Sequence, residues 1–169
     1  MKHNFFDAKF FKEEIKTDQL LGICDPEGDS CAYTSSERNG PDSWCATIHN
    51  PNRKRIRFIA IDKNMNILRS HGELESTCDG MVYASDTREL SFVELKKYHT
   101  GGAMSAAVEQ LKSTLELFLA SHNYKDYKSR MAYACNPVRP YFKPSYREFS
   151  REFRKKYKFR LLTQADVIF

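Results

Sequence analysis

Three charged residues, Asp79, Glu94 and Lys96, occur within two apolar segments of the sequence, 78–83 (CDGMVY) and 90–96 (LSFVELK). Both segments are rich in β-branched and other apolar residues and are separated by a short polar stretch, so we expect a β-hairpin. Two carboxylates beside a lysine can hold a divalent cation such as Mg²⁺ or Mn²⁺, because these ions prefer hard oxygen ligands. With the ion bound, such a set is suited to phosphodiester hydrolysis.

The register of this hairpin decides whether the two carboxylates meet. A turn centred on residues 86–87 would pair Tyr83 with Leu90. The same register places Asp79 opposite Glu94, with the lysine of the second segment on the same face. Apolar residues on both faces predict that the hairpin is largely covered. Buried like charges are costly, and a cation between them would remove that cost.

A structural role for the same residues is the alternative. The tripeptide 94–96 (ELK) is common, and it could be a strand end with an ion pair that needs no function. The sequence after it favours a site. Apolar residues recur at three- and four-residue steps over 104–118, which predicts an amphipathic helix, and residues 128–135 are predicted to form a strand.

In this order, Asp79, Glu94 and Lys96 followed by a helix bearing Gln110 resemble the PD-(D/E)XK nuclease superfamily, over about residues 71–135. The resemblance implies an α/β fold with a restriction-endonuclease-like core, in which a central mixed sheet is flanked by helices. It also implies a Mg²⁺ or Mn²⁺ cofactor. The catalytic residues that it implies are Asp79, Glu94, Lys96 and Gln110.

The metal ligands implied by the resemblance are Asp79, Glu94 and the main-chain carbonyl of Leu95. Members of the superfamily often have an earlier acidic residue, for which Glu75 and Glu73 are candidates, and Glu75 is a possible further metal ligand. The sequence departs from the motif at one position, because a cysteine, residue 78, stands where the motif has its proline.

The remaining sequence predicts a single domain over 1–169. We expect an N-terminal helix at about 6–21 and a loop-rich segment at about 24–50. The further expected strands and helix are a strand at 56–62, a strand at 66–68, a helix at about 145–157 and short strands at 159–162 and 167–169. This mixed order favours a mixed sheet flanked by helices over an all-α or all-β domain.

Positive charge is concentrated in the C-terminal third of the chain. Residues 1–120 have 15 Lys and Arg against 18 Asp and Glu, whereas residues 121–169 have 12 against 4. Aromatic and basic residues alternate over 141–160, as a surface that binds nucleic acid requires. The predicted phosphate contacts are Arg147, Arg151, Lys155 and Lys158. The spacing of Phe149, Phe153 and Tyr157 also fits a helix with an apolar stripe in the core and a merely solvated basic face.

The composition excludes several classes of protein. No apolar run is long enough to span a membrane, and the N-terminus lacks the apolar run of a signal peptide, so a cytoplasmic location without membrane association is expected. Five cysteines without close pairing indicate free thiols. A zinc site at Cys24, Cys31, Cys45 and His49 remains an alternative, although these spacings differ from those of short zinc knuckles.

The sequence therefore predicts a metal-dependent nuclease, with DNA as the favoured substrate. The alternative is a catalytically inactive module of the same fold that binds nucleic acid or a protein partner. A small nuclease core would need specificity from its loops, its basic third, homodimerisation or a partner protein.

Overall fold

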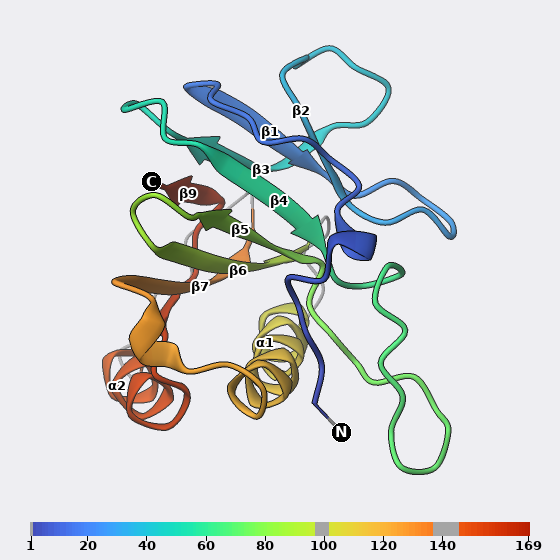
Figure 1. The fold of residues 1–169 in the computed structure, drawn as a ribbon, viewed down its shortest axis with the longest axis vertical. Coiled ribbons are helices and arrows are strands. Elements are labelled where there is room, and N and C mark those ends of the chain that lie inside the picture. The colour runs from blue at the N-terminus through green and yellow to red at the C-terminus, as the bar shows by residue number, and fades with distance from the viewer. Residues whose placement is uncertain (1, 97–101, 137–145) are drawn as a thin grey trace.

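The computed structural model describes residues 2–96, 102–136 and 146–169, and it has an α/β fold in which two mixed sheets combine with helices (Figure 1). Residues 141–145 of the basic segment lie outside this part of the chain. The strands are β1 (Leu20–Cys24), β2 (Tyr33–Ser35), β3 (Trp44–His49), β4 (Ile56–Ala60), β5 (Gly80–Ala84), β6 (Glu89–Leu95), β7 (Ser129–Cys135), β8 (Arg160–Leu162) and β9 (Asp166–Ile168). The α-helices are α1 (Ala103–Leu119) and α2 (Tyr146–Tyr157), and short 3₁₀ helices cover Ala8–Phe10 and Tyr124–Asp126.

The larger sheet has five strands in the order β4-β5-β6-β7-β8. β4, β5 and β6 are antiparallel, whereas β6, β7 and β8 are parallel and are connected through α1 and α2. The predicted hairpin register is confirmed, because Tyr83 pairs with Leu90 and Gly80 pairs with Val93. The predicted strands over 56–62 and 128–135 and the helices over 104–118 and 145–157 are confirmed as well, within a few residues at their ends.

The two faces of the five-stranded sheet are covered differently. One face packs against α1 and α2 through Phe92, Leu111, Phe118 and Phe153. The opposite face packs against the second sheet, where Val82 and Tyr133 share a core with residues of β1 and β3. The expectation of a sheet flanked by helices therefore holds for one face, whereas a sheet covers the other (Figure 1).

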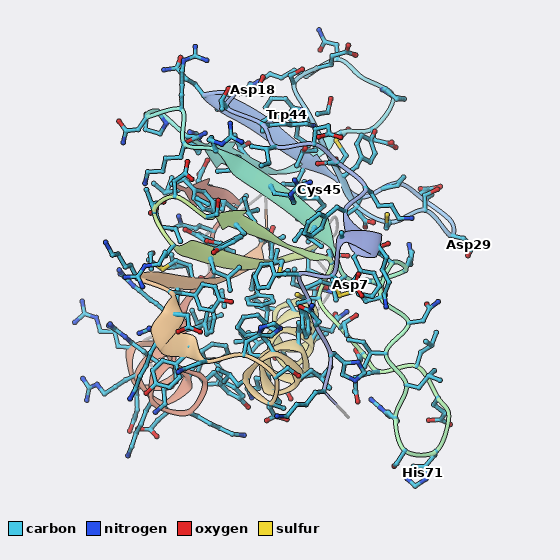
Figure 2. The ribbon with its side chains drawn as sticks, in the orientation of Figure 1. Asp7, Asp18, Asp29, Trp44, Cys45 and His71 are labelled. Carbon is cyan, nitrogen blue, oxygen red and sulfur yellow. The ribbon has the colours of Figure 1, made fainter. Side chains whose placement is uncertain are left out.

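The second sheet has the order β2-β1-β3-β9, and two of its strands lie within the segment expected to be loop-rich, most of which is loop as predicted. β2 and β3 lie within 24–50, with loops between them. At Gly22 of β1 the missing side chain leaves room for Trp44, since a Cβ there would lie 2.1 Å from Trp44 Cγ. Figure 2 shows Trp44 above the β1 ribbon.

The predicted N-terminal helix over 6–21 is wrong. This segment has one short 3₁₀ turn and then becomes extended, with a backbone bridge between Lys16 and Ile56 before β1 begins. Aromatic residues at its start are held by tertiary packing: Phe5, just before the segment, is fully buried in the core, and Phe6 packs on Tyr83. Tertiary packing of these rings outweighs the helical spacing of the apolar residues.

The predicted strand over 66–68 is absent from the described structure. Leu68 forms an isolated bridge with Leu74, and both side chains are exposed. These residues belong to a loop that projects from the body of the molecule, with His71 near its tip (Figure 2). Over the described ranges, neither α-helix combines the length and apolar character needed to cross a membrane.

Candidate metal and phosphodiester site

Asp79 and Glu94 lie side by side at one end of the β5-β6 hairpin. Gly80 pairs with Val93, so the next residues outward are Asp79 and Glu94. Asp79 Oδ2 accepts a hydrogen bond of 2.6 Å from the backbone N–H of Leu95. Gly80 lets β4 approach closely here, because a Cβ on it would lie 2.6 Å from Phe58 Cζ. The hairpin thus brings the two carboxylates together, as the sequence predicts.

Glu94 is only 2% exposed, although it is an acidic residue at the end of a strand. Its Oε1 atom pairs with Lys96 Nζ at 2.7 Å. Its Oε2 atom is buried and has no hydrogen-bond partner in the described part of the chain. Buried carboxylate oxygens are normally satisfied, so an unpaired one indicates a position where a ligand can bind.

Gln110 of α1 fixes Lys96 in place. Lys96 Nζ donates a 2.9 Å hydrogen bond to Gln110 Oε1, and Gln110 Nε2 donates to the Thr77 carbonyl at 3.3 Å. Both polar atoms of Gln110 are therefore engaged by the protein, which makes it a positioning residue for the lysine in this arrangement. The sequence led us to expect that it would orient water or phosphate directly.

Thr114 connects the same helix to the segment that leads into Asp79 and β5. Its Oγ1 accepts a 2.7 Å hydrogen bond from the Cys78 backbone N–H and donates to the Gln110 carbonyl at 2.8 Å. The apolar stripe of α1, with Leu111 and Leu115 fully buried, sets the rotation of the helix. Together these contacts bring the polar side of α1 against the segment leading into Asp79.

The electrostatics of the pair favour protonation in the absence of a cation. Burial raises the pKa of Glu94 to about 9, and the charge of Asp79 adds to the rise while Lys96 opposes it. Burial also raises the pKa of Asp79 to about 6, against the hydrogen bond from Leu95, which lowers it. Two neighbouring carboxylates in a poorly solvated position cannot both ionise without cost.

The main chain of Leu95 faces the same position. Its N–H points toward Asp79, whereas the N–H of Lys96 donates to the Cys135 carbonyl on the other side. In an extended strand the N–H and C=O of one residue face the same neighbour, so the Leu95 carbonyl is directed toward β5. This direction fits the predicted role of Leu95.

Glu75 occupies a different environment from the other predicted ligands. Its Oε1 atom accepts hydrogen bonds from Arg69 at 3.0 and 3.1 Å and from Ser113 Oγ at 3.1 Å. These contacts lower its pKa, with the Arg69 hydrogen bond as the largest cause. Glu73 is exposed, and its carbonyl accepts from the Arg69 N–H. The described contacts of both residues join them to the projecting loop and α1 rather than to Asp79 or Glu94.

Two further acidic residues near the site were missed by the sequence reasoning. The negative charges of Asp25 and Asp62 each raise the pKa of Asp79. Asp62 lies just beyond β4, and its N–H donates to the Cys78 carbonyl at 3.2 Å. Its place at the end of the predicted strand 56–62 was an available signal, whereas Asp25 reaches this region through the second sheet. Within the described ranges, no three His, Cys, Asp or Glu residues form a metal-binding group.

Three of the four predicted phosphate contacts lie on α2 and Lys158 directly follows it; all four are exposed, but they lie at different ends of the helix. Phe153 and Tyr157 are buried as predicted, whereas Phe149 is 40% exposed and lies under the Lys112 ammonium. α2 ends just before β8, which begins at the end of the sheet far from Leu95, so the first turns of α2, which bear Arg147 and Arg151, lie nearer the site end of the sheet. Lys155 and Lys158 lie where β8 begins, at the opposite end of the sheet.

Comparisons with protein-family models, with curated proteins and with solved structures found no match to this chain.

Proposed function

We propose that the protein is a metal-dependent phosphodiesterase that acts on nucleic acid, with DNA as the favoured substrate. The observation that supports this most is the unpaired, buried Oε2 atom of Glu94 next to a second, partly buried acid, Asp79. A divalent cation between them would satisfy the free oxygen and neutralise the repulsion between the two carboxylates.

The donor set fits Mg²⁺ or Mn²⁺. Asp79, Glu94 and the carbonyl of Leu95 offer hard oxygen atoms, whereas a soft metal would need thiolate or imidazole ligands. Mg²⁺ is commonly bound by one or two carboxylates and keeps several waters, so a site with two acidic side chains is sufficient. When bound, the ion would polarise a phosphate oxygen and lower the pKa of a water molecule.

Lys96 supplies the positive charge that the protein itself contributes. An ammonium group has three N–H donors, and two of them are directed to Glu94 and Gln110 at 2.7 and 2.9 Å. Among the described residues no acceptor is seen for the third, which can therefore donate to a phosphate oxygen, since the side chain is 23% exposed. Because Gln110 and Glu94 hold the ammonium in one position, its charge is already oriented toward the negative charge that develops in phosphoryl transfer.

The test is a cleavage assay on labelled single- and double-stranded DNA and RNA, with Mg²⁺, Mn²⁺ or a chelator. We expect cleavage that depends on the metal and stops with the chelator. Folded protein that binds nucleic acid but cleaves none of these substrates would support the inactive binding module instead. Folded protein that neither binds nor cleaves nucleic acid would contradict both.

The basic side of α2 gives a separate prediction. We expect the double variant Arg147→Ala and Arg151→Ala to flatten the plot of log K against log salt by about two units, one for each lost phosphate contact. The effect should be similar for all sequences, and electrophoretic or fluorescence titrations at several salt concentrations would measure it.

The matched control is the double variant Lys155→Ala and Lys158→Ala, which removes the same charge. α2 has 12 residues and is therefore about 18 Å long, so these lysines lie at the far end from the site. We expect the control to change the slope less. An unchanged slope in both variants would mean that this face of the helix is merely solvated.

A further inference from the structure

A hollow of about 400 Å³ lies on the helix-covered side of the five-stranded sheet, at the end where β5 reaches the hairpin turn. Its walls include four aromatic residues, Phe6, Phe11, Tyr83 and Tyr127, and Arg55 and Arg57 also line it. Most small-molecule sites are concave, mainly apolar spaces of this size with a few polar groups. We call it the tyrosine-arginine pocket.

The pocket is separate from the metal and phosphodiester site. Tyr83 lies four residues along β5 from Asp79, which corresponds to about 13 Å. Met81 lies between them on the same face and is fully buried. Binding of a ligand in this pocket therefore does not depend on the proposed nuclease activity.

Two phenolic hydroxyl groups in the pocket are free to bind a ligand. Tyr127 is only 7% exposed, and its ring packs at 5.9 Å from that of Tyr83. Among the described residues, neither hydroxyl forms a hydrogen bond, although both side chains line the hollow. Both hydroxyl groups can therefore bind to a ligand that carries hydrogen-bonding atoms on a flat, otherwise apolar body.

The two arginines set the charge of that ligand. The Arg57 guanidinium lies 4.3 Å from the centre of the Phe11 ring, and its Nη1 donates to the Glu13 carbonyl at 2.6 Å. Within the described part of the chain its other N–H groups have no acceptor. Arg55 is exposed, with Asp86 no closer than 3.9 Å. An aromatic cage alone would suit a cation, but two guanidinium groups exclude one. They favour an anion that accepts several hydrogen bonds, such as a phosphate.

We propose that the tyrosine-arginine pocket binds a nucleoside monophosphate. The heterocyclic base would pack against Phe6, Tyr83 and Tyr127, with its polar edge toward the two hydroxyl groups, and the phosphate would lie at Arg55 and Arg57. Aromatic walls favour a base because base–aromatic stacking is strong and tolerates any base. The same chemistry is offered by a free nucleotide and by the 5′-phosphorylated end of a strand.

Isothermal titration calorimetry tests this proposal. It is done in the presence of a chelator, because the chelator removes any metal-dependent binding at Asp79 and Glu94. The probes are the four common nucleoside monophosphates, the matching nucleosides, inorganic phosphate and a 5′-phosphorylated oligonucleotide. We expect the monophosphates to bind more tightly than either the nucleosides or inorganic phosphate. Tighter binding of the oligonucleotide than of the free nucleotides would identify a strand end as the ligand.

Two variants locate the binding. Arg55→Gln should weaken monophosphate binding about tenfold, the loss of one charge-assisted hydrogen bond, and leave nucleoside binding unchanged. Tyr127→Phe keeps the ring and removes an unpaired hydroxyl, so it should weaken both ligands without lowering the melting temperature. The control Arg160→Gln removes an equal charge outside the pocket and should have little effect.

Three outcomes would overturn the proposal. The first is that no monophosphate binds at millimolar concentration. The second is that inorganic phosphate binds as tightly as the nucleotides, which would mean that the aromatic walls contribute nothing. The third is that Arg160→Gln weakens binding as much as Arg55→Gln does, which would indicate nonspecific attraction to the positive surface.

Discussion

Replacing Lys96 with methionine should lower metal-dependent cleavage by about 10² or more while Mn²⁺ still binds. The substitution removes an ammonium group that lies 2.7 Å from Glu94 Oε1 and keeps most of the apolar length of the side chain. The loss of this cation also removes a charge that competes with the metal, so the affinity for Mn²⁺ should persist or increase. Single-turnover cleavage and calorimetric titration with Mn²⁺ measure the two effects separately.

Asp79→Asn provides the contrast. It removes one of the two carboxylates, so both cleavage and Mn²⁺ binding should be strongly reduced. Asparagine can still accept the 2.6 Å hydrogen bond from Leu95, and the protein should therefore remain folded. Full cleavage by the Lys96→Met variant would show that the Glu94–Lys96 pair is structural and would refute the proposed role of the lysine.

The second large effect concerns pH. The pKa values of Glu94 and Asp79 are raised by burial, to about 9 and about 6, so at neutral pH the pair without metal holds a proton that a cation must displace. The affinity for Mn²⁺ should consequently rise up to tenfold per pH unit between about pH 6 and pH 8. Calorimetry in buffers with different ionisation enthalpies would detect the released proton.

The same pKa shifts should make the metal-free protein less stable as the pH rises, whereas they make Mn²⁺ binding tighter. A carboxyl group whose pKa is higher in the folded than in the unfolded state stabilises the fold at low pH, and this contribution is lost as the pH rises through the folded-state value. The metal-free protein should therefore become less stable to urea between pH 5 and pH 8. Glu94→Gln should remove most of this dependence. If the metal-free parent protein and Glu94→Gln both gain stability over this range, the two carboxylates are not the groups responsible.

The parent protein must be compared with Glu94→Gln because other groups titrate in or near the same pH range. Burial lowers the pKa of His122, which makes the fold more stable as the pH rises through this range. The buried thiols of Cys78 and Cys135 have raised pKa values, so they affect the stability only above this pH range. The difference between the parent protein and Glu94→Gln isolates the contribution of the acidic pair.

The core of the site was predictable because it depends on local rules. Strand periodicity and a short turn fix the β5-β6 register, and that register alone brings Asp79 beside Glu94. The helix α1 follows from its apolar spacing. These elements are neighbours along the chain, so no long-range pairing had to be known.

The rest depends on contacts that spacing does not encode. The extended N-terminal segment is held by the bridge between Lys16 and Ile56, and the second sheet needs β9 to pair with β3. In the same way, the free Oε2 atom of Glu94 and the role of Gln110 follow from how α1 packs on the hairpin. Tyr83 and Tyr127 come from different strands and loops, so no local motif predicted their pocket.

The parallel pairing of β3 with β9 affects how the polypeptide folds. His49 and Asp166, whose side chains are 2.7 Å apart, are separated by 117 positions in the chain. Closing so long a loop costs conformational entropy and is therefore slow, whereas the β5-β6 hairpin and α1 form from local contacts. Until β9 arrives, one edge of β3 has unpaired backbone groups that can pair with another molecule. Refolding at high concentration should thus be prone to aggregation at this edge, which makes the arrival of β9 the kinetically vulnerable stage.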